Sequence, residues 1–331
     1  MTVLVTGAAG FIGMHLSTRL LGRGEKVVGI DNLNDYYDVS LKEARIRRLQ
    51  DHEHFTFKKV DFSDMDALTD ALAGEPIRRV VHLGAQAGVR YSLDHPFAYV
   101  QANLLGHMCL LEFCRHRPDI EHLVYASSSS VYGGNTELPF SETDRVDNPV
   151  SLYAATKKSD ELMSQCYSHL YRMPQTGLRF FTVYGPWGRP DMALWIFTKA
   201  IYAGEPIRVF NRGEMRRDFT YVEDIVSGVV GVLYNPPKDD GTVKANGSTA
   251  PHRVYNIGNH RSEELTHMIE VLEKAIGKTA EKIYEPMQPG DVRETYADID
   301  AIRADVGYEP TTTIDAGVPK FVEWYREYHG L

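Results

Sequence analysis

The sequence predicts an α/β protein built on a doubly wound parallel sheet, with a smaller carboxyl-terminal α/β lobe. Two observations support this prediction. Through the first 180 residues, short apolar segments rich in β-branched residues alternate with helix-length segments, which is typical of βαβ units in a sheet covered on both faces. After about residue 185 the alternation fades, and glycine and proline become more frequent.

The strands are expected in chain order over residues 3–5, 26–30, 56–60, 79–83, 122–126 and 176–181. Because crossovers between parallel strands are right-handed, helices should cover both faces and ligands should bind at the carboxyl ends of the strands. We expect a first domain over residues 1–180, to which a later segment, roughly 218–257, is a candidate to return. Residues 181–331 should form most of the second lobe.

Composition excludes several classes of protein. The chain has 331 residues, of which 43% are hydrophobic and 24% charged, as in ordinary globular proteins. With 36 Lys and Arg against 45 Asp and Glu the net charge is −9, so no nucleic-acid partner is expected. The sequence contains no run of ~18 apolar residues, so no membrane span is expected. The 3 cysteines lack metal-ligand spacing and indicate a reducing compartment, so we expect a cytoplasmic protein without a metal site.

The loop after the first strand has glycines spaced for a dinucleotide. Gly7, Gly10 and Gly13 would permit a tight turn, approach of the backbone to a pyrophosphate, and close packing of the next helix. Alone, this spacing fits an ordinary β–α turn equally well. Asp31 at the end of the second strand favours the dinucleotide, because a carboxylate there binds the ribose 2′-OH and repels the 2′-phosphate of NADP. We therefore predict NAD as the cofactor.

Further cofactor contacts are expected beside these residues. Phe11 and Ile12 belong to the glycine loop, and Asn32 follows Asp31. Asp61, followed by Phe62, ends the third strand segment. Asp61 could accept a hydrogen bond from adenine or, nearly as well, cap the next helix.

A tyrosine and a lysine stand four residues apart, at positions 153 and 157, so they share one face of a helix. Tyr153 would be a poor base at its ordinary pKa near 10. The cations of Lys157 and of nicotinamide both favour the phenolate, and Lys157 can also hold the nicotinamide ribose. An exposed helix pair is the alternative, but the dinucleotide loop and a preceding serine cluster favour catalysis.

That serine cluster, residues 127–130, follows a predicted buried strand. Hydroxyls at the carboxyl end of a parallel strand are well placed to meet a substrate. The alternative is a turn in which the serines cap their own backbone. Ser128 is the candidate to pass a proton between a substrate hydroxyl and Tyr153.

Together these motifs resemble the NAD-dependent epimerase/dehydratase family of extended short-chain dehydrogenases with a Rossmann fold, and the resemblance covers nearly the whole chain. The strings at 31–38, 82–92 and 185–193 resemble its UDP-glucuronate 4-epimerase branch in particular. The resemblance implies that NAD takes a hydride from sugar C4 while Tyr153 takes the O4 proton. Return of the hydride to the other face would give UDP-galacturonate. It also implies a homodimer, with two helices packed from each subunit.

The resemblance also implies individual contacts. Cofactor contacts are expected at Leu83, Ala85, Gln86 and Asn103. Substrate contacts are expected at Arg90, Ser128, Ser129, Ser130, Thr182, Arg189, Arg217 and Arg293. The last two arginines correspond to diphosphate ligands, for which a guanidinium fork is well suited.

Two other functions are compatible with the same fold. A UDP-glucose 4-epimerase would need no anion site at C6, so Arg90, Arg189 and the hydroxyl groups favour a uronic acid. A non-catalytic NAD-binding sensor is disfavoured by the intact Ser128, Tyr153 and Lys157. Related dehydratases and decarboxylases usually carry an acid where this chain has Ser130, which argues against those reactions.

Overall fold

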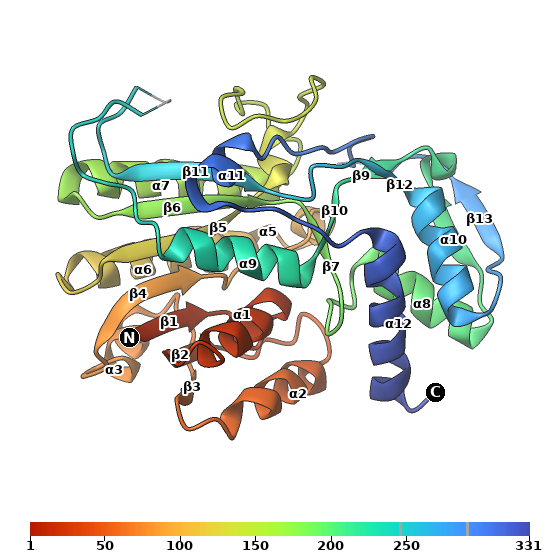
Figure 1. The fold of residues 1–331 in the computed structure, drawn as a ribbon, viewed down its shortest axis with the longest axis horizontal. Coiled ribbons are helices and arrows are strands. Elements are labelled where there is room, and N and C mark those ends of the chain that lie inside the picture. The colour runs from red at the N-terminus through yellow and green to blue at the C-terminus, as the bar shows by residue number, and fades with distance from the viewer. Residues whose placement is uncertain (245–246, 289–290) are drawn as a thin grey trace.

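The computed structural model describes residues 1–244, 247–288 and 291–331. At its centre is a seven-stranded sheet in the order β11-β6-β5-β4-β1-β2-β3, in which all neighbouring strands are parallel (Figure 1). The predicted fold class is confirmed. The strands of the sheet are β1 (Thr2–Thr6), β2 (Lys26–Asp31), β3 (Phe55–Lys59), β4 (Ile77–His82), β5 (His122–Ser128), β6 (Gln175–Phe180) and β11 (His252–Ile257).

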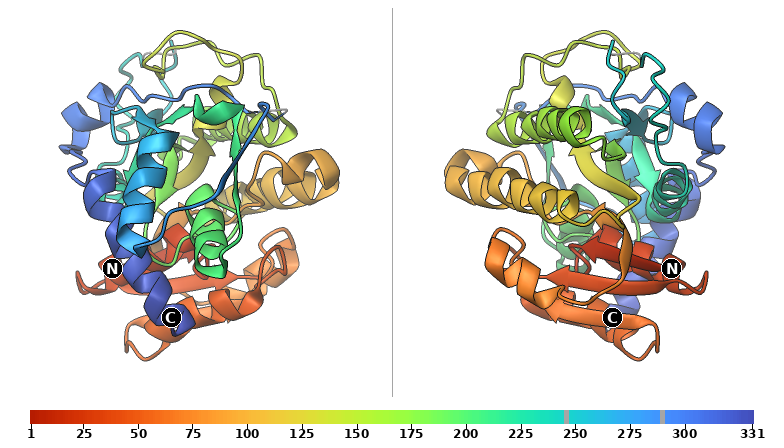
Figure 2. Two further views of the ribbon diagram at one scale, coloured as in Figure 1. Left: turned by 90° about the vertical axis from the view of Figure 1, so that its right-hand side faces the viewer. Right: turned by 90° about the vertical axis from the view of Figure 1, so that its left-hand side faces the viewer.

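Helices cover both faces of this sheet (Figures 1 and 2). One face carries α1 (Phe11–Leu21), α2 (Val39–Gln50), α9 (Val222–Leu233) and α11 (Asp300–Val306). The other carries α3 (Met65–Ala71), α6 (Gly106–Arg115) and α7 (Leu152–Tyr171). Between β4 and α6 the chain forms α4 (Tyr91–Asp94), α5 (Pro96–Tyr99) and the π-helical segment η1 (Val100–Leu105), and β5 runs into the 3-10 turn η2 (Ser129–Tyr132).

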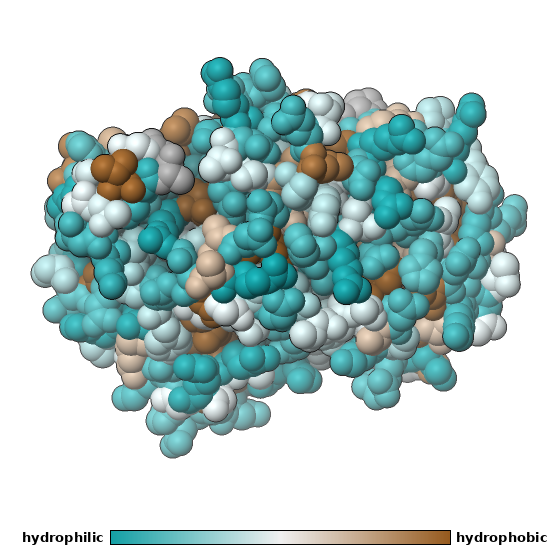
Figure 3. All heavy atoms as spheres, turned by 45° about the horizontal axis from the view of Figure 1, so that its top comes forward, coloured by the Kyte–Doolittle hydropathy of each residue, from teal (hydrophilic) through white to brown (hydrophobic). Residues whose placement is uncertain are grey.

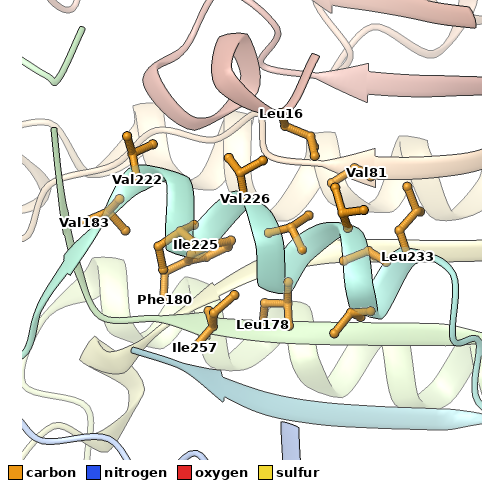
Figure 4. Close-up of a cluster of buried hydrophobic side chains, with 14 of the residues drawn as sticks. Leu16, Val81, Leu178, Phe180, Val183, Val222, Ile225, Val226, Leu233 and Ile257 are labelled. Carbon is orange, nitrogen blue, oxygen red and sulfur yellow. The ribbon is translucent and has the colours of Figure 1, made fainter. Parts of the chain in front are cut away.

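Late segments of the chain complete the core of the sheet. Helix α9 buries apolar residues at helical spacing, among them Val222, Ile225 and Val226, against Leu178 of β6 and Ile257 of β11 (Figure 4). Each such fully buried side chain contributes roughly 1.5–3 kcal/mol relative to an exposed one. Residues from beyond position 220 are therefore part of the same packed unit as β6.

The remaining elements form a second lobe beyond the carboxyl ends of the central strands (Figure 1). Its apolar core draws on α8 (Ala193–Ala203), α10 (Leu265–Ile276) and α12 (Ile314–His329). Three two-stranded sheets complete it: β7 (Thr182–Tyr184) with β10 (Phe219–Tyr221), β9 (Arg216–Arg217) with β12 (Glu263–Glu264), and β8 (Ile207–Phe210) with β13 (Lys282–Glu285). The short turn η3 spans Asn211–Gly213.

Hydrophilic residues dominate the face drawn in Figure 3, where hydrophobic residues form small separate patches. Within the described residues, no helix combines the length and the apolar character needed to cross a membrane.

Candidate active site

A cleft of about 660 Å³ runs along the carboxyl ends of the central strands and reaches the second lobe. Most residues predicted for the site line it. These are Gly7, Gly10, Phe11, Ile12, Gly13, Asp31, Asn32, Asp61, Phe62, Leu83, Ala85, Gln86, Ser128, Ser129, Ser130, Tyr153, Lys157, Thr182, Arg189 and Arg217. The lining does not include Arg90, Asn103 or Arg293.

The glycine loop is a backbone surface without room for side chains. Gly7 has φ +68°, and a Cβ there would lie 2.8 Å from Gly84 N. A Cβ on Gly13 would lie 2.1 Å from the Gly7 carbonyl oxygen. Gly10, the N-cap of α1, donates its N–H to that same carbonyl at 2.9 Å. A bare backbone at a helix N-terminus fits the pyrophosphate of a dinucleotide.

Asp31 is buried at the end of β2. Its two carboxylate oxygens accept hydrogen bonds from the Leu33 N–H at 2.9 Å and the Ala9 N–H at 3.2 Å. Burial raises the pKa of Asp31, although these bonds and the charges of Lys42 and Arg45 oppose the shift. The bonds fix the carboxylate in place, and its remaining lone pairs can accept from a ribose hydroxyl.

Asp61 forms a local turn rather than a helix cap. Its Oδ1 accepts from the Ser63 N–H and hydroxyl at 2.9 and 2.7 Å, and its Oδ2 accepts from the Asn32 amide at 3.0 Å. Burial acts to raise its pKa, but these hydrogen bonds outweigh burial and lower it. The N-cap of α3 is Asp64, which accepts from the Ala67 N–H at 3.0 Å, so the capping interpretation of Asp61 is wrong.

Tyr153 and Lys157 occupy the first turns of α7. The helix begins at its N-cap Ser151, whose hydroxyl accepts from the Ala154 N–H at 3.1 Å. The Lys157 ammonium is buried and donates to the Ala126 carbonyl at 3.0 Å and to Asp160 Oδ2 at 3.1 Å. Among the described residues, no hydrogen bond involves the Tyr153 hydroxyl, which leaves this group on the cleft wall available to a ligand.

The serine cluster forms a local turn and also lines the cleft. Ser128 is the N-cap of η2: its hydroxyl accepts from the Ser130 N–H and donates to the Ser130 hydroxyl, both at 3.1 Å. Ser127 donates to Glu161 at 2.8 Å. Residues 128–130 nevertheless line the cleft, so formation of the turn does not remove them from the site.

Two arginines bring positive charge to the cleft. Arg189 pairs with Asp191 through contacts of 3.0 and 2.5 Å, and Asp191 also accepts from the Tyr36 hydroxyl at 3.0 Å. Burial acts to lower the pKa of Arg189, but Asp191 outweighs it and the pKa is raised. Arg217 donates to the carbonyls of Arg216 and Arg293 at 2.8 and 3.1 Å. Burial lowers its pKa.

The three residues outside the lining have other contacts. Arg90 pairs with Asp291 at 2.9 Å and lies over the Phe210 ring. The Arg293 side chain is 76% exposed. Asn103 accepts from the Gln86 N–H at 2.8 Å and donates to the Gln86 carbonyl at 3.1 Å, so it holds a cleft residue without lining the cleft itself.

Comparisons with known proteins identify the family to which this chain belongs. Residues 4–321 match the model of the family described as GDP-mannose 4,6 dehydratase. The chain belongs to this family. A protein of Rhizobium meliloti named probable UDP-glucuronate 4-epimerase is 47% identical, over 99% of this chain and 97% of that protein. Protein CapI of Staphylococcus aureus is 52% identical, over 99% of both chains.

A solved structure is similar throughout. The UDP-glucuronic acid 4-epimerase of Bacillus cereus, in complex with UDP-glucuronic acid and NAD, superposes with a TM-score of 0.87 at 34% identity, covering 99% of this chain and 100% of that one. The resemblance predicted from the sequence motifs is therefore confirmed at the level of the family and its epimerase branch.

Residues not predicted from the sequence also shape the site of this family member. Tyr36 and Lys42 line the cleft. Arg45 is fully buried and donates to the Ala9 carbonyl at 3.1 Å, to the Trp187 carbonyl at 2.6 Å and to the Gly188 carbonyl at 3.0 Å. It therefore joins the glycine loop to the segment that carries Arg189. One sequence signal could have identified them: Lys42 and Arg45 are two basic residues, three positions apart, on the otherwise apolar buried face of α2.

Proposed function

We propose that this protein catalyses the NAD-dependent C4 epimerisation of UDP-glucuronate to UDP-galacturonate. The observation that carries the proposal is the Tyr153 hydroxyl, which has no hydrogen-bond partner among the described residues and lies two helical positions from the cap of α7, one turn from the buried Lys157. This pair lines the same cleft as the bare glycine loop and Asp31. The names of the Rhizobium and Bacillus relatives support the choice of substrate.

The glycine loop, Asp31 and Lys157 would hold NAD, with Asn32, Asp61, Leu83, Ala85 and Gln86 beside them. When bound, NAD supplies the acceptor for the C4 hydride and later the donor that returns it. Tyr153, as the phenolate, takes the O4 proton when the C4–H bond breaks and gives it back when that bond re-forms. Lys157 stabilises the phenolate, and Ser128 relays the proton. Two electrons leave and return, so no net oxidation occurs.

The sugar carboxylate distinguishes this substrate from a neutral hexose. Ser129, Ser130 and Thr182 offer hydroxyls to it, and Arg189 offers a positive charge. Arg217 would bind the diphosphate. Each hydrogen bond to a charged group contributes ~1.5–3 kcal/mol, which a UDP-glucose 4-epimerase, the alternative function, would not gain at C6.

An NMR time course of the purified protein with UDP-glucuronate tests the proposal. The expected product is UDP-galacturonate. A UDP-pentose with released carbon dioxide would identify a decarboxylase. Conversion of UDP-glucose alone would favour the alternative epimerase. If the reaction yields no product and no enzyme-bound NADH forms, the protein is a non-catalytic NAD sensor.

We also propose a homodimer, formed through α5, η1, α6 and α7 of each copy. Helices α6 and α7 lie next to each other (Figure 2, right). Large apolar side chains of this region are exposed, including Phe97 at 84% and Leu162 at 59%, and a second copy would bury them. Light scattering should give a dimer mass for the native protein and a monomer mass for Phe97→Glu with Leu162→Glu.

A cytoplasmic location is the remaining part of the proposal. Cys109 and Cys114 are buried and Cys166 is exposed, and all three are free thiols. Free cysteines are compatible with a reducing compartment. Fractionation of the producing cell should therefore recover the protein with the cytoplasmic enzymes.

A further inference from the structure

Asp160 is paired with Lys157 but, unlike Lys157, is not among the residues that line the cleft. Its Oδ2 accepts a hydrogen bond from Lys157 Nζ at 3.1 Å, and the two side chains are only 2% and 4% exposed. Its Oδ1 is buried without a hydrogen-bond partner among the described residues. Burying a half-paired carboxylate is costly. Buried titratable groups with perturbed pKa values are concentrated at functional sites, so a functional role of the Asp160 carboxylate is expected.

The other charged groups on α7 do not compensate Asp160. Glu161 is next in the chain, but its carboxylate accepts two hydrogen bonds from Arg179 at 2.8 and 3.0 Å. Lys158 is paired with Glu161 as well. Lys157 is therefore the cation whose charge acts on Asp160.

The neighbouring elements present neutral rings. His107 of α6 bonds the Asp160 backbone, and burial lowers the pKa of His107 to about 3. The rings of His82 on β4 and Tyr125 on β5 lie 5.4 and 5.2 Å from the His107 ring. Burial lowers the pKa of His82 and raises that of Tyr125, so all three groups are uncharged near neutral pH.

We propose that Asp160 is a positioning residue that draws the Lys157 ammonium away from Tyr153 and thereby sets the pH at which Tyr153 can act as a base. The proposal rests on the role of Tyr153 given above. An ammonium has three N–H donors. Ala126 and Asp160 take two of them, which leaves one for the cleft. An ionised Asp160 also opposes the attraction of Lys157 for a phenolate.

Protonation of Asp160 would release this restraint. Burial raises the pKa of Asp160 to about 6, against the opposing effect of Lys157. Below that pH the Lys157–Asp160 pair gains a full positive charge, which favours the phenolate. The two titrations are then coupled, and activity should fall gradually, rather than steeply, as the pH is lowered.

The pH dependence of kcat/KM for UDP-glucuronate epimerisation, from about pH 5 to about pH 9, tests this inference. Asp160→Asn removes the charge but keeps an oxygen that can accept from Lys157. In this variant the acid limb should move down by roughly half to one pH unit and steepen to a single ionisation. The matched control is Asp300→Asn, because Asp300 also pairs with a basic residue three positions away in the chain, Arg303, at 3.1 Å. Its profile should equal that of the wild type.

An acid limb that stays in place in Asp160→Asn would overturn the inference. If Asp160→Asn does not fold, Asp160→Ser also removes the carboxylate, and the same shift is expected. A wild-type protein that does not epimerise UDP-glucuronate would instead refute the proposed function.

A second measurement does not depend on turnover. With ¹³C-labelled aspartate carboxyl groups in the wild-type holoenzyme, the NMR signal that disappears in Asp160→Asn should titrate near pH 6. A signal that stays ionised down to about pH 4 would overturn the inference, because Asp160 could not then change charge where Tyr153 works.

Discussion

The two walls of the cleft are built by different means. The side proposed for the cofactor, the cofactor wall, is formed by the bare backbone of the glycine loop after β1 and by residues that follow β2 to β4. The substrate wall consists of side chains, with Arg189 and Arg217 from segments that follow β7. Arg45 links the two by donating to carbonyls on both sides. A backbone wall leaves a short local pattern in the sequence, whereas a side-chain wall depends on how distant segments pack.

The largest effect is expected where the two walls meet. Tyr153→Phe keeps the ring but removes the proton acceptor, and a general base is worth ~10²–10⁴-fold in rate. Turnover of UDP-glucuronate should fall by that factor while bound NAD is retained, as measured by NMR and by cofactor content. Tyr167→Phe is the matched control, because Tyr167 lies on the same helix and its hydroxyl bonds Glu112 outside the cleft. Near-normal turnover in Tyr153→Phe would remove this residue from the mechanism.

The difference between the walls also explains what the sequence could predict. Six strands of the central sheet, the glycine loop and the end-of-strand position of Asp31 follow from local periodicity and spacing, and the structure places them as expected. The seventh strand, β11, was not predicted as a strand. The hydrogen bond from Tyr36 to Asp191, the partner of Arg189, does not follow, because Tyr36 is 155 residues from Asp191 in the chain. Arg90 pairs with Asp291, which lines the cleft, a contact that no spacing indicates.

The next largest effect is expected from a substitution in the glycine loop of the cofactor wall, and it concerns stability and NAD binding. In Gly13→Ala the new Cβ would lie 2.1 Å from the Gly7 carbonyl oxygen and 2.9 Å from its carbon, so the loop must move. Overpacking of this kind costs about 1–3 kcal/mol, and both the free energy of unfolding and NAD retention should fall. Gly134→Ala is the control, because a Cβ there meets nothing within 4 Å. Equal stability and NAD content in the two variants would show that the loop is not rigid.

A smaller effect is expected from a side chain on the cofactor wall. Asp31→Ala removes the acceptor for the ribose 2′-OH. It also leaves the charges of Lys42 and Arg45, which act on Asp31 in the native protein, free to attract a 2′-phosphate. The preference for NAD over NADP should fall by roughly tenfold, the equivalent of one charge-assisted hydrogen bond. Competition of NADP against bound NAD measures the ratio. An unchanged preference would mean that the 2′-phosphate is excluded by shape, with the segment from Asn32 to Asn34 as the candidate.

The smallest effect concerns a single hydroxyl of the substrate wall and changes the product rather than the rate. A 4-keto hexuronic acid is a β-keto acid, so the oxidised sugar can lose carbon dioxide from C5 when the bond to its carboxylate stands perpendicular to the ketone plane. Thr182 and Ser129 line the cleft, and no described residue takes their hydroxyls in a hydrogen bond, so both can hold the carboxylate near that plane. One such bond contributes ~1.5–3 kcal/mol, enough to bias the orientation of a freely rotating group.

Thr182→Ala, or Ser129→Ala, should therefore raise the fraction of decarboxylated UDP-pentose several-fold, with only a modest loss of total turnover. Thr143→Ala is the control, since its hydroxyl bonds Ser141 in an exposed loop, and its product should stay hexuronic. The product ratio is read by NMR in one reaction, so differences in enzyme concentration cancel. If Thr182→Ala and Ser129→Ala slow epimerisation but yield no pentose, the hydroxyls only position the sugar. Retention of the carboxylate would then be explained by the absence of a carboxylic acid at the position of Ser130, and not by hydrogen bonds that hold the carboxylate.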